Sequence, residues 1–428
     1  MVEKYNVGDC VRIETSTHEF EGRVLESPQD ASEILLLKLD SGYNIGVLKK
    51  DLKSLKIVGN FSETSKTLDV KIPIVSGKKS IALIITGGTI SSQLDVKTGA
   101  VKWITSPSTL LQNYPEIFDI ANVAKVEVPF MKASENMNSG DWKKIAKVVE
   151  QYLQDPGISG IIITHGTDFL HYTGSALAFF LGRVNKPVVL TYAQRSSDRA
   201  SSDARLNLVC AAQAAISDIA EVMLVGHATN NDDFCYAMPA TKVRKMHTSR
   251  RDAFKIINSQ PFAKITKEMI QPLSKYHIRS ELKKKFNIDS VFDNKVALID
   301  FYPGQDPSIL EWYLKQGYRG IVLMTSGLGH LPTKESGNNW IPVIKKIIAA
   351  GMTVCAVPQT LYGRLNPKVY SAGRELEDSG IIFLQDMLPE TAFVKLGWVL
   401  GHKDWKGKFI REKMLENVAG EFNERLEE

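Results

Sequence analysis

The first residues that could do chemistry are a threonine and the two glycines before it. The sequence Thr86-Gly87-Gly88-Thr89-Ile90 comes directly after the apolar run 81–85. Two glycines let the backbone turn sharply and bring its N–H groups close to a ligand, which leaves the Thr89 hydroxyl at the mouth of a loop. A tight turn without any function explains the same pattern, so this motif alone is weak. It is not a phosphate-binding loop, because it lacks the Gly-x4-Gly-Lys-Ser/Thr pattern.

A second threonine stands at the corresponding place after the apolar run 160–163. The sequence there is Thr164-His165-Gly166-Thr167-Asp168. A hydroxyl, a carboxylate that can orient a base and a glycine-rich backbone that can donate to an oxyanion suit nucleophilic acyl transfer. The motif lacks a clear general base, since a histidine within such a turn is more often a structural hydrogen-bonding residue than a catalyst.

The candidate base lies in the basic segment 244–254, which contains Arg244, Lys245, Arg250 and Arg251. A lysine deprotonates a hydroxyl only where burial or neighbouring positive charge lowers its pKa. A neighbouring carboxylate has the opposite effect on the pKa, although it can orient the amine. A solvated basic face is the plainer explanation of this composition, and the residues alone leave both explanations open.

These motifs need a scaffold that brings the ends of different strands together. Apolar runs of strand length alternate with helical stretches from residue 80 onward, which predicts an α/β domain with a mainly parallel sheet. In such sheets the chemistry lies in the loops at the carboxyl ends of the strands, where both threonine motifs stand. The predicted strands are 81–86, 160–164, 188–192 and 222–225, and the predicted helices are 140–154, 172–183 and 203–219.

A second α/β unit is predicted over residues 295–428. Its strands 296–301, 320–324, 353–357 and 381–383 alternate with helices 308–316 and 340–349. The polar, lysine-rich segment 258–294 is interpreted as a connector after a catalytic domain at 80–257. From residue 404 onward, apolar residues four apart predict a terminal amphipathic helix that packs on its own core: Ile410, Met414, Val418, Phe422 and Leu426.

The first 58 residues differ from the rest of the chain in their pattern of apolar and polar residues. Short alternating segments separated by glycine and proline, at 10–13, 20–25, 34–39 and 45–48, predict a small all-β barrel. The polar stretch 59–79 is interpreted as a linker. The expected fold is therefore a two-domain α/β body preceded by a small all-β domain.

Composition narrows the possible function classes. The 428 residues carry 53 Lys and Arg and 48 Asp and Glu, a net charge of +5 that is too weak for a dedicated nucleic-acid-binding protein. Four dispersed cysteines form no CxxC pair, which favours reduced thiols over disulfides or a zinc site. The N-terminus lacks the apolar core of a signal peptide, and the apolar runs are far shorter than the ~20 residues of a membrane helix. We therefore expect a cytoplasmic protein.

Taken together, the motifs resemble those of the L-asparaginase/glutaminase family over roughly residues 80–400. Residues 86–90 and 165–170 are similar to its two threonine signatures, and 303–308 and 326–332 to parts of its smaller C-terminal domain. The resemblance implies an asparaginase-like α/β body that hydrolyses an amide through a covalent acyl-threonine. It implies neither a metal nor an organic cofactor in this chain.

The resemblance also implies catalytic roles. Thr89 is the expected nucleophile, and Thr167 and Asp168 act with Lys245 as the activating group. Lys245 is assigned by its spacing of nine residues ahead of Phe254 in the family's pattern. Two alternatives stay open, namely Thr167 as the nucleophile and Lys242 as the base.

Substrate binding is expected at two glycines and one further segment. Gly88 and Gly166 belong to the substrate site, with backbone N–H groups near Gly88 and Thr167 donating to the oxyanion. The sequence Ser134-Glu135-Asn136-Met137 is similar to the family segment that holds the substrate's α-amino and α-carboxylate groups. Ser134 is the expected carboxylate contact. Glu135, where many members carry Gln, would pair with the ammonium group unless it is an ordinary surface charge.

Three features differ from a free-standing asparaginase. About eighty residues precede the first threonine signature, and the segment 245–254 is unusually basic. In addition, Thr98-Gly99-Ala100 stands where many bacterial members carry a catalytic tyrosine, and the nearest aromatic residue is Trp103. A small N-terminal barrel on an asparaginase-like body resembles the archaeal D-type subunits of glutamyl-tRNA(Gln) amidotransferases.

That family implies a glutaminase that works with a partner. The chain would release ammonia from glutamine, while the E-type subunit of the same amidotransferase uses ATP and Mg²⁺ to activate the glutamate of Glu-tRNA(Gln), which becomes Gln-tRNA(Gln). A homodimer within a two-plus-two heterotetramer is implied as well. Two alternatives stay open. The chain would be a free-standing cytosolic L-asparaginase, or an RNA- or protein-binding module built on an amidase fold that has lost its activity.

Overall fold

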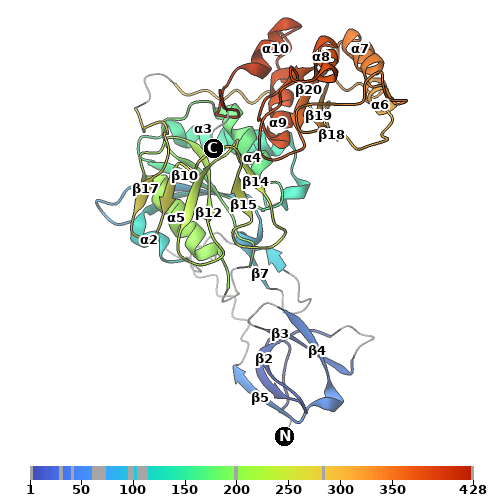
Figure 1. Ribbon diagram of the computed structural model, residues 1–428. Coiled ribbons are helices and arrows are strands. Elements are labelled where there is room, and N and C mark those ends of the chain that lie inside the picture. The colour runs from blue at the N-terminus through green and yellow to red at the C-terminus, as the bar shows by residue number, and fades with distance from the viewer. Residues whose placement is uncertain are drawn as a thin grey trace.

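The computed structural model of the chain has three parts in sequence order: a small β domain, a larger α/β domain and a second α/β domain (Figure 1). Within the described residues, no helix is both long and apolar enough to cross a membrane. Thr98–Ala100, most of the predicted linker and Leu426 lie outside the described residues. The structure describes residues 3–27, 32–39, 43–59, 74–94, 101–103, 114–196, 201–281 and 285–425.

The N-terminal domain is one antiparallel sheet in the order β4-β3-β2-β1-β5, which confirms a small all-β domain. Alternate residues on its strands are buried, among them Val11, Ile13, Leu35 and Leu37, as the period of two in a strand requires. The alternating pattern predicted the first four strands but missed the fifth. The elements are β1 (Cys10–Glu14), β2 (Glu19–Val24), β3 (Ile34–Leu39), β4 (Asn44–Leu48), η2 (Lys49–Asp51) and β5 (Ser54–Gly59).

The second domain is built on an eight-stranded sheet in the order β17-β16-β13-β12-β11-β10-β6-β9. The strands from β12 to β9 pair in parallel, as predicted, and the remaining three extend the sheet in antiparallel fashion. The parallel strands are β6 (Ser80–Ile85), β9 (Asn122–Glu127), β10 (Gly160–Thr164), β11 (Val188–Thr191) and β12 (Val222–His227).

Helices cover both faces of this sheet. On one face Ile161 and Ile163 pack with α3 and α4, and on the other face Ile162 packs with α5. Successive residues of a strand point to opposite faces, so a continuous apolar run is what a sheet buried on both sides requires. The helices are α2 (Ile117–Ile120), α3 (Ser139–Gln154), α4 (Leu170–Leu181) and α5 (Ala204–Ile216), and the 3-10 turns are η3 (Thr89–Ser91) and η4 (Ser134–Asn136).

The segment predicted as a polar connector contributes two strands to the sheet instead of lying wholly outside it. Ala263 and Ile265 are fully buried in β16, although the three-residue strands are too short to show a clear alternation. Two further ribbons stand apart from the main sheet, β7 with β8 and β14 with β15. The strands are β7 (Ser92–Leu94), β8 (Val101–Trp103), β13 (Cys235–Pro239), β14 (Val243–Lys245), β15 (Phe254–Ile256), β16 (Ala263–Ile265) and β17 (Ile270–Pro272).

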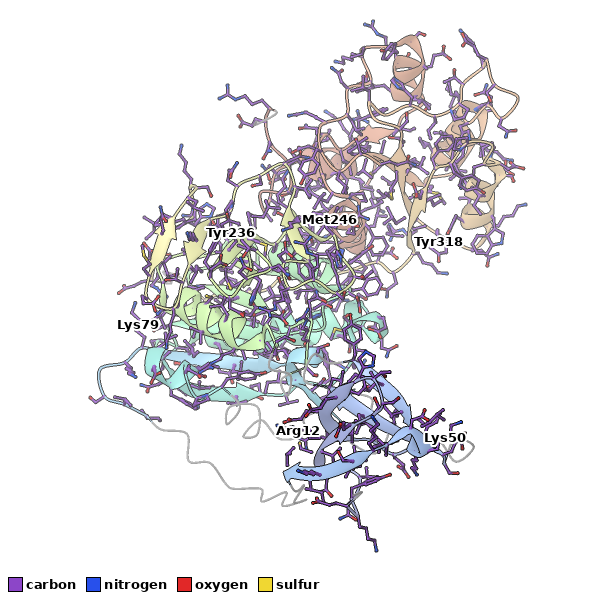
Figure 2. All side chains as sticks on the ribbon, turned by 60° about the horizontal axis from the view of Figure 1, so that its bottom comes forward. Arg12, Lys50, Lys79, Tyr236, Met246 and Tyr318 are labelled. Atoms are coloured by element: carbon purple, nitrogen blue, oxygen red, sulfur yellow. The ribbon has the colours of Figure 1, made fainter. Side chains whose placement is uncertain are left out.

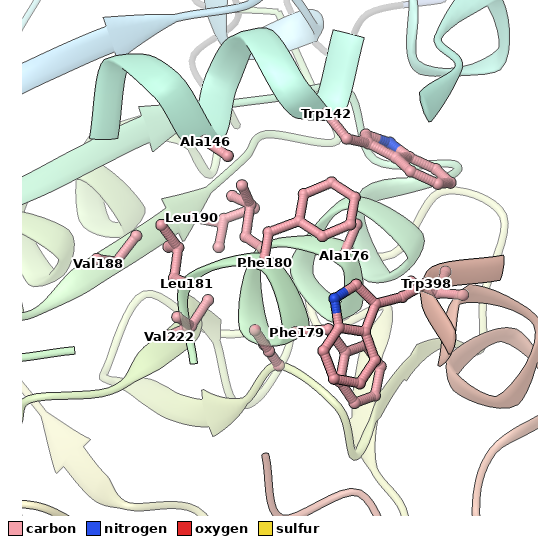
Figure 3. Packing of buried hydrophobic residues seen from close by; sticks show 14 of the residues in the cluster. Trp142, Ala146, Ala176, Phe179, Phe180, Leu181, Val188, Leu190, Val222 and Trp398 are labelled. Atoms are coloured by element: carbon pink, nitrogen blue, oxygen red, sulfur yellow. The ribbon is translucent and has the colours of Figure 1, made fainter. Parts of the chain in front are cut away.

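The C-terminal domain has a four-stranded parallel sheet in the order β18-β19-β20-β21, as the second alternating pattern predicted. Its helix α9 packs on α4 of the larger α/β domain. There the rings of Phe179 and Trp398, both labelled in Figure 3, stack with 5.8 Å between their centroids. The elements are β18 (Val296–Asp300), α6 (Ser308–Lys315), β19 (Gly320–Thr325), α7 (Ile341–Ala349), β20 (Thr353–Pro358), α8 (Ser371–Asp378), β21 (Ile382–Phe383), α9 (Pro389–Gly401) and α10 (Lys408–Leu415).

The prediction of one helix from residue 404 onward is wrong beyond α10. The buried amine of Lys395 donates to Met414 O at 3.0 Å and to the Glu421 carboxylate. That carboxylate in turn accepts from Val418 N and Ala419 N, so these backbone groups are satisfied without a further helical turn. The described apolar residues spaced four apart thus pack on one core, as expected, but they do not form one continuous helix.

Candidate active site

The first threonine turn follows β6, and its two glycines set its shape. Gly87 and Gly88 have positive φ angles of 123° and 87°. A Cβ on Gly88 would lie 2.5 Å from Gly166 N, so glycine is what lets the two threonine turns approach this closely. Thr89 follows as the half-buried first residue of η3.

Hydrogen bonds tie the second threonine turn to the first. The Thr86 hydroxyl donates to Thr164 O at 2.7 Å, which joins the ends of the parallel neighbours β6 and β10. Ser91 Oγ lies 3.3 Å from Thr164 Oγ1. Thr89 and Thr167 therefore stand on adjoining turns at the carboxyl edge of one sheet.

Lys245 reaches the second turn from β14. Its Nζ donates to Thr167 Oγ1 at 2.8 Å and to Asp168 Oδ1 at 2.8 Å. The lysine side chain is 10% exposed and that of Asp168 is 61% exposed, so the amine is enclosed while the carboxylate faces the open side. The hydroxyl, amine and carboxylate form one hydrogen-bonded chain, in which a neutral amine could take a hydroxyl proton.

Lys242, the alternative candidate, has a different partner. Its Nζ donates to Asp386 Oδ2 at 2.7 Å, and both side chains are almost fully buried. Burial lowers the pKa of Lys242, and the Asp386 carboxylate opposes that shift. This pair joins the catalytic domain to the C-terminal domain, so of the two lysines Lys245 is the one that contacts Thr167.

His165 belongs to the scaffold of the turn. Its buried ring places Nδ1 2.7 Å from Gly166 O and Nε2 2.9 Å from Thr173 Oγ1. Burial lowers the pKa of His165 to about 4, so the ring is neutral near pH 7. The neutral ring donates from Nδ1 to the carbonyl and accepts from the Thr173 hydroxyl, an assignment that rests on this hydrogen-bond network. It thereby fixes the peptide that precedes Thr167.

Ser134 and Glu135 begin η4, next to the second turn. Ser134 is buried, and its Oγ accepts from Phe169 N at 3.4 Å. A Cβ on Gly166 would lie 3.1 Å from this oxygen. The structure therefore brings Ser134 against the Thr167 turn, whereas the neighbouring Glu135 is exposed.

A cleft of about 700 Å³ borders Lys245 on the side of the C-terminal domain, and both domains line it. Met246, labelled in Figure 2, belongs to the wall that the catalytic domain contributes. In the described part of the chain, no group of three or more His, Cys, Asp and Glu residues is placed to hold a metal ion. The lining residues are Arg244, Lys245, Met246, Asp300, Phe301, Tyr302, Pro303, Met324, Gln359 and Leu361.

The sequence analysis missed a buried polar cluster beside Lys245. Glu390 Oε1 lies 3.0 Å from Arg244 Nε and 4.0 Å from His171 Nε2. Burial, with the cations of Arg244 and Lys245, lowers the pKa of His171 to about 3, and burial raises the pKa of Glu390. One signal for this cluster was present in the sequence, because Glu390 is an acidic residue within the largely apolar run 388–400.

Models of three protein families match the chain. The asparaginase N-terminal family matches residues 80–276, and the glutaminase/asparaginase C-terminal domain matches residues 295–414. The GatD N-terminal domain matches residues 5–58, which contain nearly all of the small β domain.

Solved structures of asparaginases share the fold of the two α/β domains. The thermostable L-asparaginase from Thermococcus kodakarensis has a TM-score of 0.70 and 29% identity, and covers 81% of this chain and 100% of that chain. L-asparaginase I from Vibrio cholerae has a TM-score of 0.68 and 26% identity, and the match covers 81% of this chain and 99% of that chain. These matches confirm the asparaginase-like fold.

Curated relatives match along almost the whole chain. The D-type glutamyl-tRNA(Gln) amidotransferase subunit (GatD) from Thermococcus kodakarensis is 44% identical over 422 residues, covering 97% of this chain and 94% of its own length. The GatD proteins from Methanothermobacter thermautotrophicus and Methanosarcina acetivorans are 42% and 40% identical, each over 98% of this chain and over 94% and 99% of their own lengths. Together with the GatD N-terminal domain, these matches show that the chain belongs to the GatD family of glutamyl-tRNA(Gln) amidotransferase subunits.

Proposed function

We propose that the chain is the glutaminase subunit of a tRNA-dependent amidotransferase. It hydrolyses glutamine, and the ammonia serves the conversion of Glu-tRNA(Gln) to Gln-tRNA(Gln) by the complete enzyme. The observation that carries this proposal is the contact of Lys245 with Thr167 and Asp168, beside the Thr89 turn, in a chain of the GatD family. The GatD N-terminal domain favours this function over that of a free-standing asparaginase.

In the mechanism we propose, Thr89 attacks the side-chain carboxamide of glutamine. Backbone N–H groups near Gly88 and Thr167 stabilise the oxyanion, where one donor is worth ~3 kcal/mol. Collapse of the intermediate releases ammonia and leaves a γ-glutamyl ester on the threonine, which water hydrolyses to glutamate. Ser134 binds the substrate carboxylate, and Glu135 binds the ammonium group from the open side.

Lys245 activates a hydroxyl in this mechanism. Its 2.8 Å contact with Thr167 supports proton transfer through that hydroxyl, and Asp168 orients the amine. The same contact supports the alternative in which Thr167 itself is the nucleophile. Both versions use the same groups and differ in which threonine carries the acyl group.

Covalent labelling separates the two versions. A glutamine-derived diazoketone alkylates the attacking hydroxyl, and peptide mass spectrometry then locates the label. We expect the label on Thr89, and we expect Thr89→Ala to abolish it. A label on Thr167 would mean that Thr167 is the nucleophile and Thr89 is not. If an enzyme that hydrolyses glutamine normally acquired a label on neither threonine, the acyl-threonine mechanism would be contradicted.

The partners follow from the same proposal. ATP and Mg²⁺ act in the E-type partner of the amidotransferase, and this chain needs no cofactor of its own. We propose a homodimer of this chain within a two-plus-two heterotetramer in the cytoplasm, with tRNA(Gln) bound through the complex. Because free ammonia would be lost, glutamine turnover stays low until the partner and Glu-tRNA(Gln) bind.

A further inference from the structure

The strand that carries Lys245 does not pair with the main sheet, although Val243 on it and Phe254 on the paired strand pack in the hydrophobic core. β14 pairs with β15 over three residues, and this ribbon stands outside the eight-stranded sheet. A two-stranded ribbon is marginally stable in water unless something packs against it. The position of the Lys245 amine therefore depends on what anchors the ribbon.

The C-terminal domain supplies anchors along the approach to Lys245. The Thr391 hydroxyl donates to Thr241 O at 3.0 Å, and Asp386 accepts from Lys242 at 2.7 Å. Glu390 then meets Arg244, the residue directly before Lys245, with 3.0 Å between Oε1 and Nε. Of these anchors, the Glu390 contact is the one closest to Lys245 in sequence.

Glu390 also faces the helix that follows the second threonine turn. His171 belongs to the first turn of α4, and its Nε2 lies 4.0 Å from Glu390 Oε1. Glu390 Oε2 and His171 Nδ1 are buried without a hydrogen-bond partner in the described structure. A buried carboxylate with one oxygen unsatisfied is costly, so its presence here calls for an explanation beyond domain packing.

We propose that Glu390 is a positioning residue through which the C-terminal domain fixes Lys245 against Thr167, acting through Arg244. This inference rests on the proposed function, since it assumes that Lys245 activates a hydroxyl. The carboxylate holds the Arg244 side chain, which sets the position of β14 and of the amine that follows. It lies against α4 at the same time, so one side chain fixes the two elements whose ends must meet. A displacement of about 1 Å in such a group costs on the order of 100-fold in rate.

The test compares Glu390→Ala and Glu390→Gln with wild type in the complete complex with its partner and Glu-tRNA(Gln), using ammonia release from glutamine. We expect kcat to fall about 30- to 100-fold in Glu390→Ala while KM stays within about threefold, because the substrate contacts remain. Glu390→Gln recovers part of the loss, since its amide oxygen can still lie against the Arg244 guanidinium. The double variant Glu390→Ala/Arg244→Met is no slower than the slower single variant, as expected for two residues of one contact.

Glu421→Ala is the matched control. Glu421 is also a buried carboxylate of the C-terminal domain, and it pairs with Lys395 and with the backbone of Val418 and Ala419, none of which belongs to β14. Its loss lowers the unfolding temperature but leaves kcat within about twofold below that temperature. An unchanged kcat in both Glu390 variants, or an equal fall in Glu421→Ala, overturns the inference. Retention of turnover in Lys245→Met contradicts the role of Lys245 on which the inference rests, whereas a wild-type complex that releases no ammonia from glutamine contradicts the proposed function, so the failures are distinguishable.

Discussion

Lys245 Nζ lies 2.8 Å from Thr167 Oγ1, although 78 residues separate the two in the chain. The hydroxyl stands on a turn at the end of a buried strand, and the amine stands on a ribbon outside that sheet. Asp168 completes the contact at 2.8 Å from the same amine. The candidate site is therefore assembled from two elements that are separate in the fold, and several consequences of this assembly are measurable.

The amine of Lys245 is expected to be essential. Lys245→Met should lower kcat for glutamine by a factor of about 100 or more, because general base catalysis typically contributes this much. The control is Lys255→Met on the paired strand, whose half-exposed amine bonds Asp252. Steady-state ammonia release measures both. Similar rates in the two variants would contradict the role of Lys245.

Lys242 is expected to contribute to stability. Lys242→Met leaves the Asp386 carboxylate buried and unpaired, which should cost about 3–5 kcal/mol of unfolding free energy. The double variant Lys242→Met/Asp386→Leu should regain most of that loss, because no uncompensated charge remains. Urea unfolding measures the difference. A single variant of normal stability with 100-fold lower turnover would point to a catalytic Lys242 instead.

Gly88 is expected to tolerate no side chain. A Cβ would lie 2.4 Å from His165 O in a backbone with φ of 87°, so Gly88→Ala should force the two threonine turns apart and abolish glutamine turnover. Gly317→Ala is the control, because Gly317 also has a positive φ, 74°, but no atom within 4 Å of the added Cβ. It should cost only about 1–2 kcal/mol of stability and leave turnover unchanged. An active Gly88→Ala enzyme would mean that the turns need not touch.

The buried histidines are expected to make the fold sensitive to acid. Burial lowers the pKa of His165 from 6.5 to about 4, so between these values the unfolded chain binds a proton that the folded chain does not. The contribution of neutral His165 to the free energy of unfolding is therefore fully present above pH 6.5, and it is lost as the pH drops toward 4. At pH 5 the loss from His165 is about 2 kcal/mol, and His171, with a pKa lowered to about 3, adds a similar amount.

Unfolding curves at pH 7 and pH 5 check this expectation. Wild type should lose stability between them, and a His165→Gln variant should lose less over the same interval. A wild-type stability that does not vary between the two pH values would show that these rings are accessible to protons.

Most strands of the two mainly parallel sheets and several of their helices could be predicted because long apolar runs flanked by helical stretches leave few other interpretations. The strands β9 and β13 and the helices α8 and α9 were not predicted. The three-residue strands β14 to β17 could not be predicted, since they show no periodicity and depend on neighbours that are distant in sequence. The terminal helix was predicted too long. The buried amine of Lys395 donates to Met414 O, a carbonyl that would otherwise accept from the next turn of a longer helix. That competition depends on a tertiary contact, which the sequence pattern does not contain.

The candidate site, likewise, could be predicted only in part from the sequence. The two threonine turns were found because glycines mark them locally. Lys245 was assigned through the family resemblance, since a basic segment by itself favours a solvated face. The Glu390–Arg244 contact was missed because it crosses between domains, and a lone acidic residue in an apolar run indicates burial without indicating a partner.

The most direct test of the central claim is ammonia release by the purified chain, with glutamine and asparagine compared in parallel, before and after addition of the ATP-using partner and Glu-tRNA(Gln). The proposed function predicts slow release from both amides by the chain alone and strong stimulation with glutamine in the complete system. Brisk asparagine turnover without any partner, unchanged by its addition, would contradict it and make the chain a free-standing asparaginase.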